Sequence, residues 1–213
     1  MKEIIIFSCF IALVSLSPFG LCSQCPGPVS ANCQGMPASS LNNSMPANIT
    51  FTFDAMSQYT GGITQSGSTI LYLKVLPNNA SCKWALRVYI DNNGGSGTPP
   101  NQWEKVFSYS KFNSGTEPTL DLLQVKVYNS CRTPIFNGIF REFAPVDDSY
   151  LDIIDGAALI PAGSCTTNVN GAGSYLTNYA EYSFTIDYRI VPNMKYEPGT
   201  YQISLWFCLV EET

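Results

Sequence analysis

Four aspartates lie within one short stretch in the second half of the chain, at Asp147, Asp148, Asp152 and Asp155. Two carboxyl groups that flank a cleft, about 5 to 9.5 Å apart, are what the hydrolysis of a glycosidic bond requires. Clustered carboxylates on loops also suit Ca²⁺, which prefers hard oxygen ligands. The spacing of these aspartates separates neither kind of site from a solvated acidic loop, and we predict that they are not catalytic.

Calcium binding is the weak alternative to a structural role in turns. The candidate ligands are acidic residues beside turn signals, namely Asp91, Asp147, Asp148 and Asp152. The segment that begins at Asp91 is no EF-hand loop, because Gln102 stands where the bidentate glutamate of such a loop would fall. Asp and Asn are common in turns for conformational reasons, so we predict no cofactor.

The chain contains no histidine. Its absence excludes the Ser-His-Asp and Cys-His arrangements of nucleophilic enzymes. It also excludes every zinc, copper or non-haem iron site that needs an imidazole ligand. No glycine-rich phosphate-binding loop lies between a strand-like and a helix-like segment. These absences favour a non-enzymatic protein, and a hydrolase with an aspartate-based site is the remote alternative.

Aromatic side chains are the best positive sign of a binding site, with 12 Tyr, 12 Phe and 3 Trp in the chain. Trp103 follows a proline-rich loop, where an exposed indole could stack on a sugar ring or fill a pocket of a partner. The favoured alternative is that Trp103 packs at the end of the core, and we expect Trp84 and Trp206 to be core residues. The candidate ligand-binding residues are Trp103, Asn92, Asn93, Tyr89 and Tyr128.

The chain has 8 cysteines. Cys9 lies in an apolar N-terminal run, and Cys22 is lost with that run if the chain is cut after Ser23. The remaining cysteines are even in number, which in an oxidising compartment indicates a set of disulfides. Six cysteines allow 15 pairings, and the alternative is that some thiols are free and buried. The pairs that we predict are Cys25–Cys33, Cys82–Cys131 and Cys165–Cys208.

The first 23 residues have the parts of an export signal. Lys2 forms a short basic region, an apolar core runs from Ile4 to Leu16, and small and polar residues lead to a cut after Ser23. The apolar run is too short to span a bilayer comfortably, and no later stretch could act as an anchor. We therefore predict a secreted or cell-surface protein without a transmembrane segment. A lipid anchor is disfavoured, because neither Cys22 nor Cys25 follows the small residues that acylation requires.

Composition indicates one globular domain. After the cut about 190 residues remain, which suffices for one hydrophobic core. Hydrophobic residues make up 45% of the chain and charged residues 13%, a balance that excludes disorder. The formal net charge is −5 and no basic run exists, so we expect no nucleic-acid partner. Residues 24–47 are rich in Ser, Asn, Pro and Gly and form an N-terminal arm or loop.

Alternation of apolar and polar residues dominates the chain from residue 48 onward. A period of two is typical of half-buried strands, whereas no segment has the 3.6-residue period of an amphipathic helix. Residues 144–173 are the least regular, and Tyr150–Ile154 could be a strand or a helical turn. Turns are expected at Gly61-Gly62, Ser66-Gly67 and Pro198-Gly199. The predicted strands are Ile49–Phe53, Ile70–Val75, Trp84–Ile90, Leu123–Val127, Tyr182–Ile190 and Tyr201–Leu209.

The predicted fold class is all-β, an antiparallel β-sandwich of the Ig-like or jelly-roll-like kind, stabilised by disulfides and formed by a single domain over residues 48–213. The last strand also carries apolar residues at Trp206, Cys208 and Val210, so we expect it to lie centrally, buried on both faces.

Two segments resemble bacterial pilin-like and adhesin-like β-sandwich domains. Residues 196–205, Tyr-Glu-Pro-Gly-Thr-Tyr-Gln-Ile-Ser-Leu, are similar to their closing hairpin. Cys82-Lys83-Trp84-Ala85-Leu86 is similar to the strand that places a core tryptophan. The resemblance implies a surface or assembly role and places no functional residue on any position of this chain.

We therefore predict a secreted, non-enzymatic surface or interaction protein, adhesin-like or an extracellular assembly subunit. Its partner is expected to be an extracellular protein or glycan, or other copies of the chain through self-assembly. The first alternative is a carbohydrate-binding module that uses exposed aromatic side chains, and the second is a secreted hydrolase.

Overall fold

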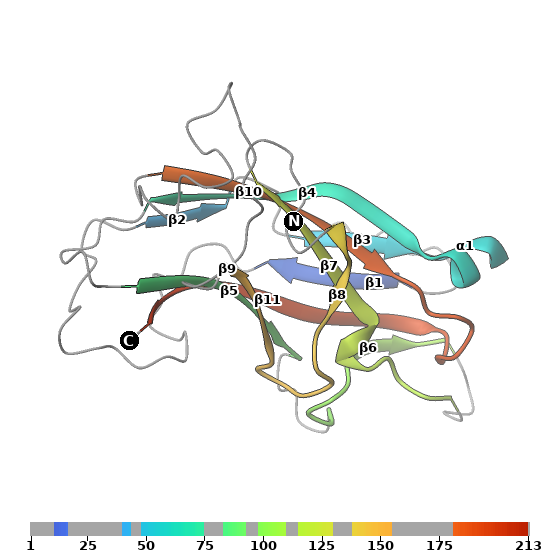
Figure 1. Cartoon of the computed structure of the whole chain (residues 1–213). Helices are drawn as coiled ribbons and strands as arrows, with labels where there is room; N and C mark the ends of the chain where they lie inside the picture. The colour runs from blue at the N-terminus through green and yellow to red at the C-terminus, as the bar shows by residue number, and fades with distance from the viewer. Residues whose placement is uncertain are drawn as a thin grey trace, which may run out of the picture.

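A computed structural model of the chain is shown in Figure 1. It describes residues 11–16, 40–43, 48–74, 83–92, 98–109, 115–129, 138–154 and 181–212. Within these ranges the chain forms two mainly antiparallel β-sheets with almost no helix. The predicted all-β class is thereby confirmed, and the two sheets are consistent with a β-sandwich.

The first sheet, called sheet A, has the strand order β3-β1-β11-β5-β9, and β6 also pairs with β11. All of its pairings are antiparallel except the one between β1 and β11, which is parallel. Its strands are β1 (Ile11–Leu16), β3 (Asn48–Thr52), β5 (Lys83–Asp91), β6 (Glu104–Ser108), β9 (Tyr150–Ile154) and β11 (Gly199–Glu212).

The second sheet, called sheet B, has the order β2-β4-β10-β7-β8 and is antiparallel throughout. In Figure 1, β4 and β10 of this sheet lie side by side, and β5 and β11 of sheet A lie below them. Its strands are β2 (Ser40–Asn43), β4 (Ile63–Lys74), β7 (Leu123–Asn129), β8 (Arg141–Glu142) and β10 (Glu181–Ile190).

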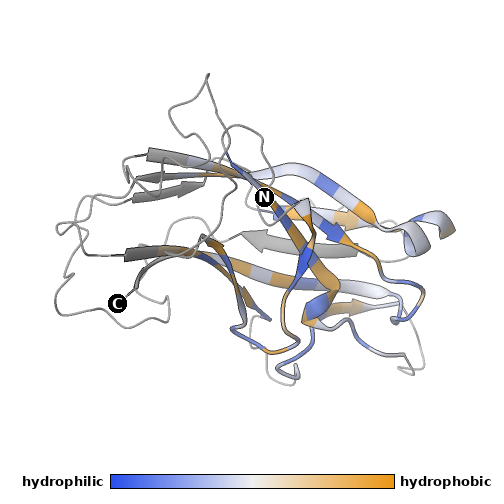
Figure 2. Ribbon diagram, in the orientation of Figure 1, coloured by the Kyte–Doolittle hydropathy of each residue, from blue (hydrophilic) through white to orange (hydrophobic). Residues whose placement is uncertain are grey.

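Alternating burial explains why these segments are strands. Along β7 every second side chain is buried, from Leu123 to Asn129, and the intervening ones are only partly buried. Figure 2 shows the corresponding change of hydropathy along the described strands. Each of the six predicted strands overlaps an observed strand, although Val75 lies outside the described residues. Tyr150–Ile154, left open between strand and helical turn, is the strand β9.

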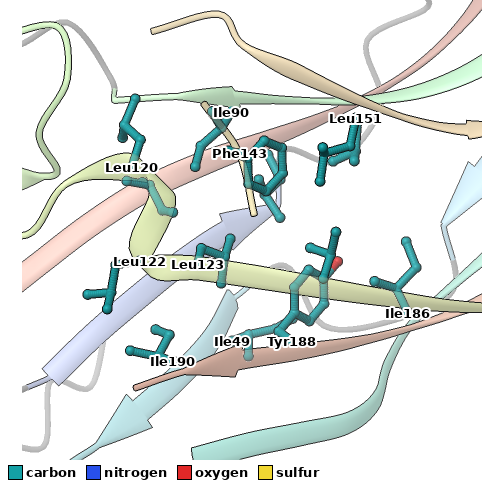
Figure 3. Close-up of a cluster of buried hydrophobic side chains, with 14 of the residues drawn as sticks. Ile49, Ile90, Leu120, Leu122, Leu123, Phe143, Leu151, Ile186, Tyr188 and Ile190 are labelled. Carbon is teal, nitrogen blue, oxygen red and sulfur yellow. The ribbon is translucent and has the colours of Figure 1, made fainter. Parts of the chain in front are cut away.

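One core joins the two sheets. Figure 3 shows Ile90 and Leu151 of sheet A facing Leu123, Ile186 and Tyr188 of sheet B. All five belong to a single cluster of buried hydrophobic side chains. Each Leu or Ile removed from water in this way contributes about 1.5–3 kcal/mol. Tyr188 is fully buried, and its hydroxyl donates a hydrogen bond of 2.9 Å to Thr69 Oγ1.

The turn predicted at Ser66-Gly67 is wrong, because β4 continues through it. Gly67 has φ of 63° and lies opposite the place where the β4–β10 register shifts, between Ile186 and Tyr188. The side chain of Asp187 fills this irregularity, and its Oδ1 accepts a hydrogen bond of 2.7 Å from the Gly67 N–H. The glycine therefore allows a bulge within a strand, where a left-handed backbone is needed.

A short helix, α1 (Met56–Gly61), was not expected from the sequence. It is held at its start by Gln58, whose Oε1 accepts hydrogen bonds from the N–H groups of Asp54 and Ala55. A helix this short gives no periodic signal in the sequence. Within the described ranges, no helix approaches the length that a bilayer crossing would need.

β11 is central, as predicted, with β1 on one side and β5 and β6 on the other. The strand β6 was missed, because Glu-Lys-Val-Phe-Ser lacks alternation and leaves Val106 and Phe107 exposed.

Candidate functional site

The strand β1 is the most consequential element of sheet A, because its residues belong to the predicted export signal. It lies between β3 and β11 (Figure 1), antiparallel to β3 and parallel to β11. Among the described residues β3 pairs with no strand other than β1. Residues 11–16 therefore link β3 to the rest of sheet A.

The register neighbours of β1 alternate between apolar and polar residues along its length. Ala12 is in register with Phe51 of β3 and Tyr201 of β11, and both of these side chains are fully buried in the core. Val14 is in register with Ile49 and Ile203, which belong to the same core cluster. Alternate residues of β1 are therefore flanked on both sides by core residues of β3 and β11.

Ile11, Leu13 and Ser15 of β1 are in register with polar residues on both flanking strands. Leu13 is in register with Thr50 and Gln202, of which Thr50 is exposed and Gln202 is partly buried. We call the place that residues 11–16 occupy, between Asn48–Thr52 and Thr200–Leu205, the strand slot. A cut after Ser23 would remove β1 and leave the hydrogen-bonding edges of β3 and β11 on either side of this slot.

A network around Glu197 positions the start of β11. Lys105 Nζ lies 2.6 Å from Glu117 Oε1 and 3.3 Å from Glu197 Oε2, and the Ser108 hydroxyl donates to Glu197 Oε1. The Ser108 hydrogen bond and then Lys105 lower the pKa of Glu197, although burial acts in the opposite direction. These contacts join β6 to the segment that enters β11, and sequence inspection had not singled out Glu197. Its signal in the sequence is weak, because its partners lie far away along the chain.

Trp103 is fully buried, so the expectation of an exposed indole is wrong and the favoured core role is confirmed. Its Nε1 donates a hydrogen bond of 3.0 Å to the Thr119 carbonyl, and its backbone N–H donates to the Pro118 carbonyl. Residues 118–119 thus hold an indole that the sequence alone could place either in the core or at the surface.

The other aromatic and amide candidates do not form one site. Tyr89 is buried on β5 of sheet A, whereas Tyr128 is partly buried on β7 of sheet B beside Lys126. Asn92 is buried, and its Nδ2 donates to the Pro99 carbonyl at 2.9 Å. Asn93 lies outside the described residues, as does the side chain of Trp84.

An exposed tyrosine was overlooked in the sequence. Tyr150 on β9 is 47% exposed, and its ring centroid lies 5.1 Å from that of Tyr89 and 4.7 Å from the guanidinium carbon of Arg87. Arg87 Nε also pairs with Asp152 Oδ1 at 2.7 Å. Asp152 therefore belongs to an ion pair on sheet A.

Asp91, Asp147 and Asp148 lie where β5 ends, and one carboxylate oxygen of Asp91 and one of Asp147 accept a hydrogen bond from the protein. Asp147 Oδ1 accepts a hydrogen bond from the Asn92 N–H, and Asp91 Oδ2 accepts one from Trp206 Nε1 at 3.0 Å. Burial, then Asp147 and Asp91, raise the pKa of Asp148. No group of three His, Cys, Asp or Glu suited to a metal ion is found in the part of the chain that the structure describes. The Asp147 carboxylate therefore joins the turn before β9 to the end of β5.

Cys208 is buried on β11. The other predicted disulfide cysteines lie outside the described residues, so none of the three predicted pairings is tested.

No protein-family model matches the chain, and no curated protein is significantly similar to it.

Proposed function

We propose that the mature chain is a secreted or cell-surface interaction protein, of the assembly-subunit kind, that binds a β-strand of another polypeptide in the strand slot. The observation that carries this proposal is the position of β1, which places predicted leader residues between two strands of the core. It is compatible with the pilin-like or adhesin-like role that residues 196–205 imply. We also propose that the two sheets form a β-sandwich of the Ig-like or jelly-roll-like kind.

Strand addition is a recurrent mode of recognition, in which main-chain hydrogen bonds provide affinity and alternate side chains provide specificity. Loss of residues 1–23 would leave β3 without a paired strand among those described. It would also remove the strand that lies beside Phe51, Tyr201 and Ile203, whose side chains are buried here. A partner strand would restore both the hydrogen bonds and the burial, so binding would be coupled to stability.

Three disulfides complete the proposed mature domain, in the pairs Cys25–Cys33, Cys82–Cys131 and Cys165–Cys208. The disulfide at Cys208 supports the presence of an oxidised framework. A peptide mass map of the exported protein under non-reducing conditions tests it, and free thiols at these positions would argue against it.

Glycan binding is the second candidate function, and Tyr150 is the observation that favours it. Its exposed ring lies beside Arg87 and Asp152, which could hydrogen-bond to sugar hydroxyls. A glycan array with the mature protein and with Tyr150→Ala separates the two candidates. Strand binding predicts no glycan signal that depends on Tyr150, whereas a signal lost in Tyr150→Ala would favour the second candidate.

The experiment for strand binding begins with the exported protein, whose N-terminus is determined by mass spectrometry. A lysine-flanked peptide with the sequence of residues 11–16, Ile-Ala-Leu-Val-Ser-Leu, is then added to it. The proposal predicts a chain that begins near Gln24 and a melting temperature that rises with peptide concentration. The matched control peptide has Asp at the position of Val14 and should not raise it. Retention of residues 1–23 after export, or no response to the first peptide, would refute the proposal.

A further inference from the structure

Two cations lie around the ring of Phe140 on the outer face of sheet B. Lys126 and Arg189 alternate with buried residues of β7 and β10, so both side chains lie on the face turned away from the core. Lys126 Nζ lies 5.6 Å from the centroid of the Phe140 ring, and the guanidinium carbon of Arg189 lies 5.4 Å from the same centroid. Ile139, the preceding residue, is 62% exposed. We call Lys126, Ile139, Phe140 and Arg189 the cationic patch.

Neither cation of this patch forms an ion pair with a carboxylate of the described residues. Asp187 is in register with Lys126, but its Oδ1 accepts a hydrogen bond from a backbone N–H of β4. Gln124 is in register with Arg189, and its Nε2 donates to Glu142 Oε1 at 2.7 Å. The two positive charges therefore repel each other without an ion pair to offset the repulsion, and an anionic group of a partner would stabilise both.

The turn between β8 and β9 carries the opposite charge. Val146 is 59% exposed, and Asp148 is exposed on a left-handed backbone with φ of 57°. Its N–H donates a hydrogen bond of 3.0 Å to the Ile90 carbonyl, which fixes the turn against β5. Burial, then the carboxylates of Asp147 and Asp91, raise the pKa of Asp148. Asp148 is thus crowded by like charges, and a cation of a partner would relieve this repulsion. We call residues 146–148 the acidic turn.

The cationic patch and the acidic turn lie close together. Ile139 and Val146 are seven residues apart, so even a fully extended chain would separate them by about 25 Å at most. The short strand β8 lies between them and pairs with β7, the strand that carries Lys126 (Figure 1). Each of the two features combines an exposed branched apolar side chain with charge of one sign. A second copy of the chain, turned about a two-fold axis near β8, would therefore meet both features at once.

We propose that two copies of the chain associate through this edge of the molecule in a two-fold dimer. Asp148 of each copy meets Lys126 and Arg189 of the other copy. Val146 of each copy meets Ile139 of the other. The occupant is a second copy because one short stretch of the chain supplies both halves of a complementary contact, and a contact of this kind closes at the dimer. The proposal does not depend on the strand slot.

The dimer is expected to be weak. Exposed ion pairs contribute little each, and small interfaces are transient. The net charge of −5 on each copy also opposes association, although salt screens it beyond about 8 Å at physiological ionic strength. We expect a dissociation constant of about 0.1–1 mM. Such a contact becomes effective where neighbouring copies are held at high local concentration, as on a surface or in an assembly.

The test is charge reversal, followed by sedimentation equilibrium of the exported protein at up to about 1 mM. Arg189→Glu and Asp148→Lys each place like charges in both contacts and should weaken the dimer about tenfold or more. An equimolar mixture of the two variants should restore it, because every contact of the mixed dimer joins opposite charges. The matched controls Lys195→Glu and Asp54→Lys make the same charge changes at exposed residues outside the two features and should leave the dimer unchanged.

A parent protein that stays monomeric throughout this range would overturn the proposal. So would a mixture that stays monomeric although each variant gives the near-ultraviolet circular dichroism of the parent, or controls that weaken the dimer as much as the variants do. Assemblies larger than a dimer would overturn the two-fold arrangement. If Arg189→Glu does not fold, Lys126→Glu takes its place in the same comparison. None of these results bears on the response to the peptide of residues 11–16, so the proposed function is tested separately.

Discussion

Val14 and Ile203 are in register on neighbouring strands, although Val14 belongs to the predicted leader and Ile203 to the core of the domain. The same pairing continues on the other side of Val14, where Ile49 of β3 is its partner. Residues of the predicted leader thus occupy a position that connects β3 to the rest of sheet A. In the proposed mature protein, a strand of another molecule has to take the place of residues 11–16.

Val14 should matter for stability as long as the leader is retained. In the full chain of residues 1–213, refolded without processing, Val14→Asp should lower the free energy of unfolding by about 2 kcal/mol or more, because its register neighbours Ile49 and Ile203 belong to the core cluster. Leu13→Asp is the matched control, since its register neighbours Thr50 and Gln202 are polar. Urea unfolding measures both variants. Equal losses would show that the register of β1 is wrong.

Trp103 should be a stability residue. Trp103→Ala removes a fully buried indole and its hydrogen bond to Thr119 and should cost about 3–5 kcal/mol. Tyr150→Ala removes a half-exposed ring and should cost about 1 kcal/mol or less. Chemical denaturation of the two variants gives the comparison. A Trp103→Ala protein as stable as the parent would contradict the burial.

Gly67 should resist substitution because of its backbone conformation. Its φ of 63° is unfavourable for a residue with a Cβ, so Gly67→Ala should cost about 1–2 kcal/mol. Space is not the reason, because the nearest atom to an added Cβ would be Thr185 Cγ2 at 3.8 Å. Gly61→Ala is the control, since nothing lies within 4 Å there and its φ is not positive. Thermal unfolding should therefore separate the two variants, and equal melting temperatures would count against the bulge.

Glu197 should make stability depend on acid pH. The Ser108 hydrogen bond and Lys105 hold its pKa below the ordinary value of 4.5, so its stabilising contribution is complete above that value. The contribution is lost as the pH falls through the lower pKa of the folded state. Glu197→Gln should cost about 1–3 kcal/mol at pH 7 and less as the pH approaches 3. Urea unfolding across this range tests the trend, and a difference that grows on acidification would contradict it.

The strands could be predicted from the sequence because the two sheets share one core, so each strand has one apolar face. β1 could not be recognised in this way, because the continuous apolar run Ile4–Leu16 satisfies an export signal and hides any alternation within it. Gly67 was misplaced because Ser-Gly in a bulge looks like Ser-Gly in a turn. The distinction depends on Asp187, which lies far away in the sequence.

Side-chain environments were harder to predict than strands. The position of Trp103 after a proline-rich loop is compatible with either exposure or burial. The hydrogen bond from its Nε1 to the Thr119 carbonyl, 16 residues along the chain, could not be predicted from that position. Of the calcium candidates, Asp152 pairs with Arg87 of another strand. Tyr150 was overlooked because its exposure follows from the place of β9 at the end of sheet A.

The central claim is that the slot is open in the mature chain and accepts a strand from another molecule. Amide hydrogen exchange of residues 200–205 tests this most directly, with and without the lysine-flanked Ile-Ala-Leu-Val-Ser-Leu peptide. Roughly half of these amides face the slot, because successive residues of a strand bond to opposite neighbours. The account predicts rapid exchange of that half in the mature chain and slow exchange once the peptide is bound. Slow exchange without the peptide, or no change on adding it, would contradict the account.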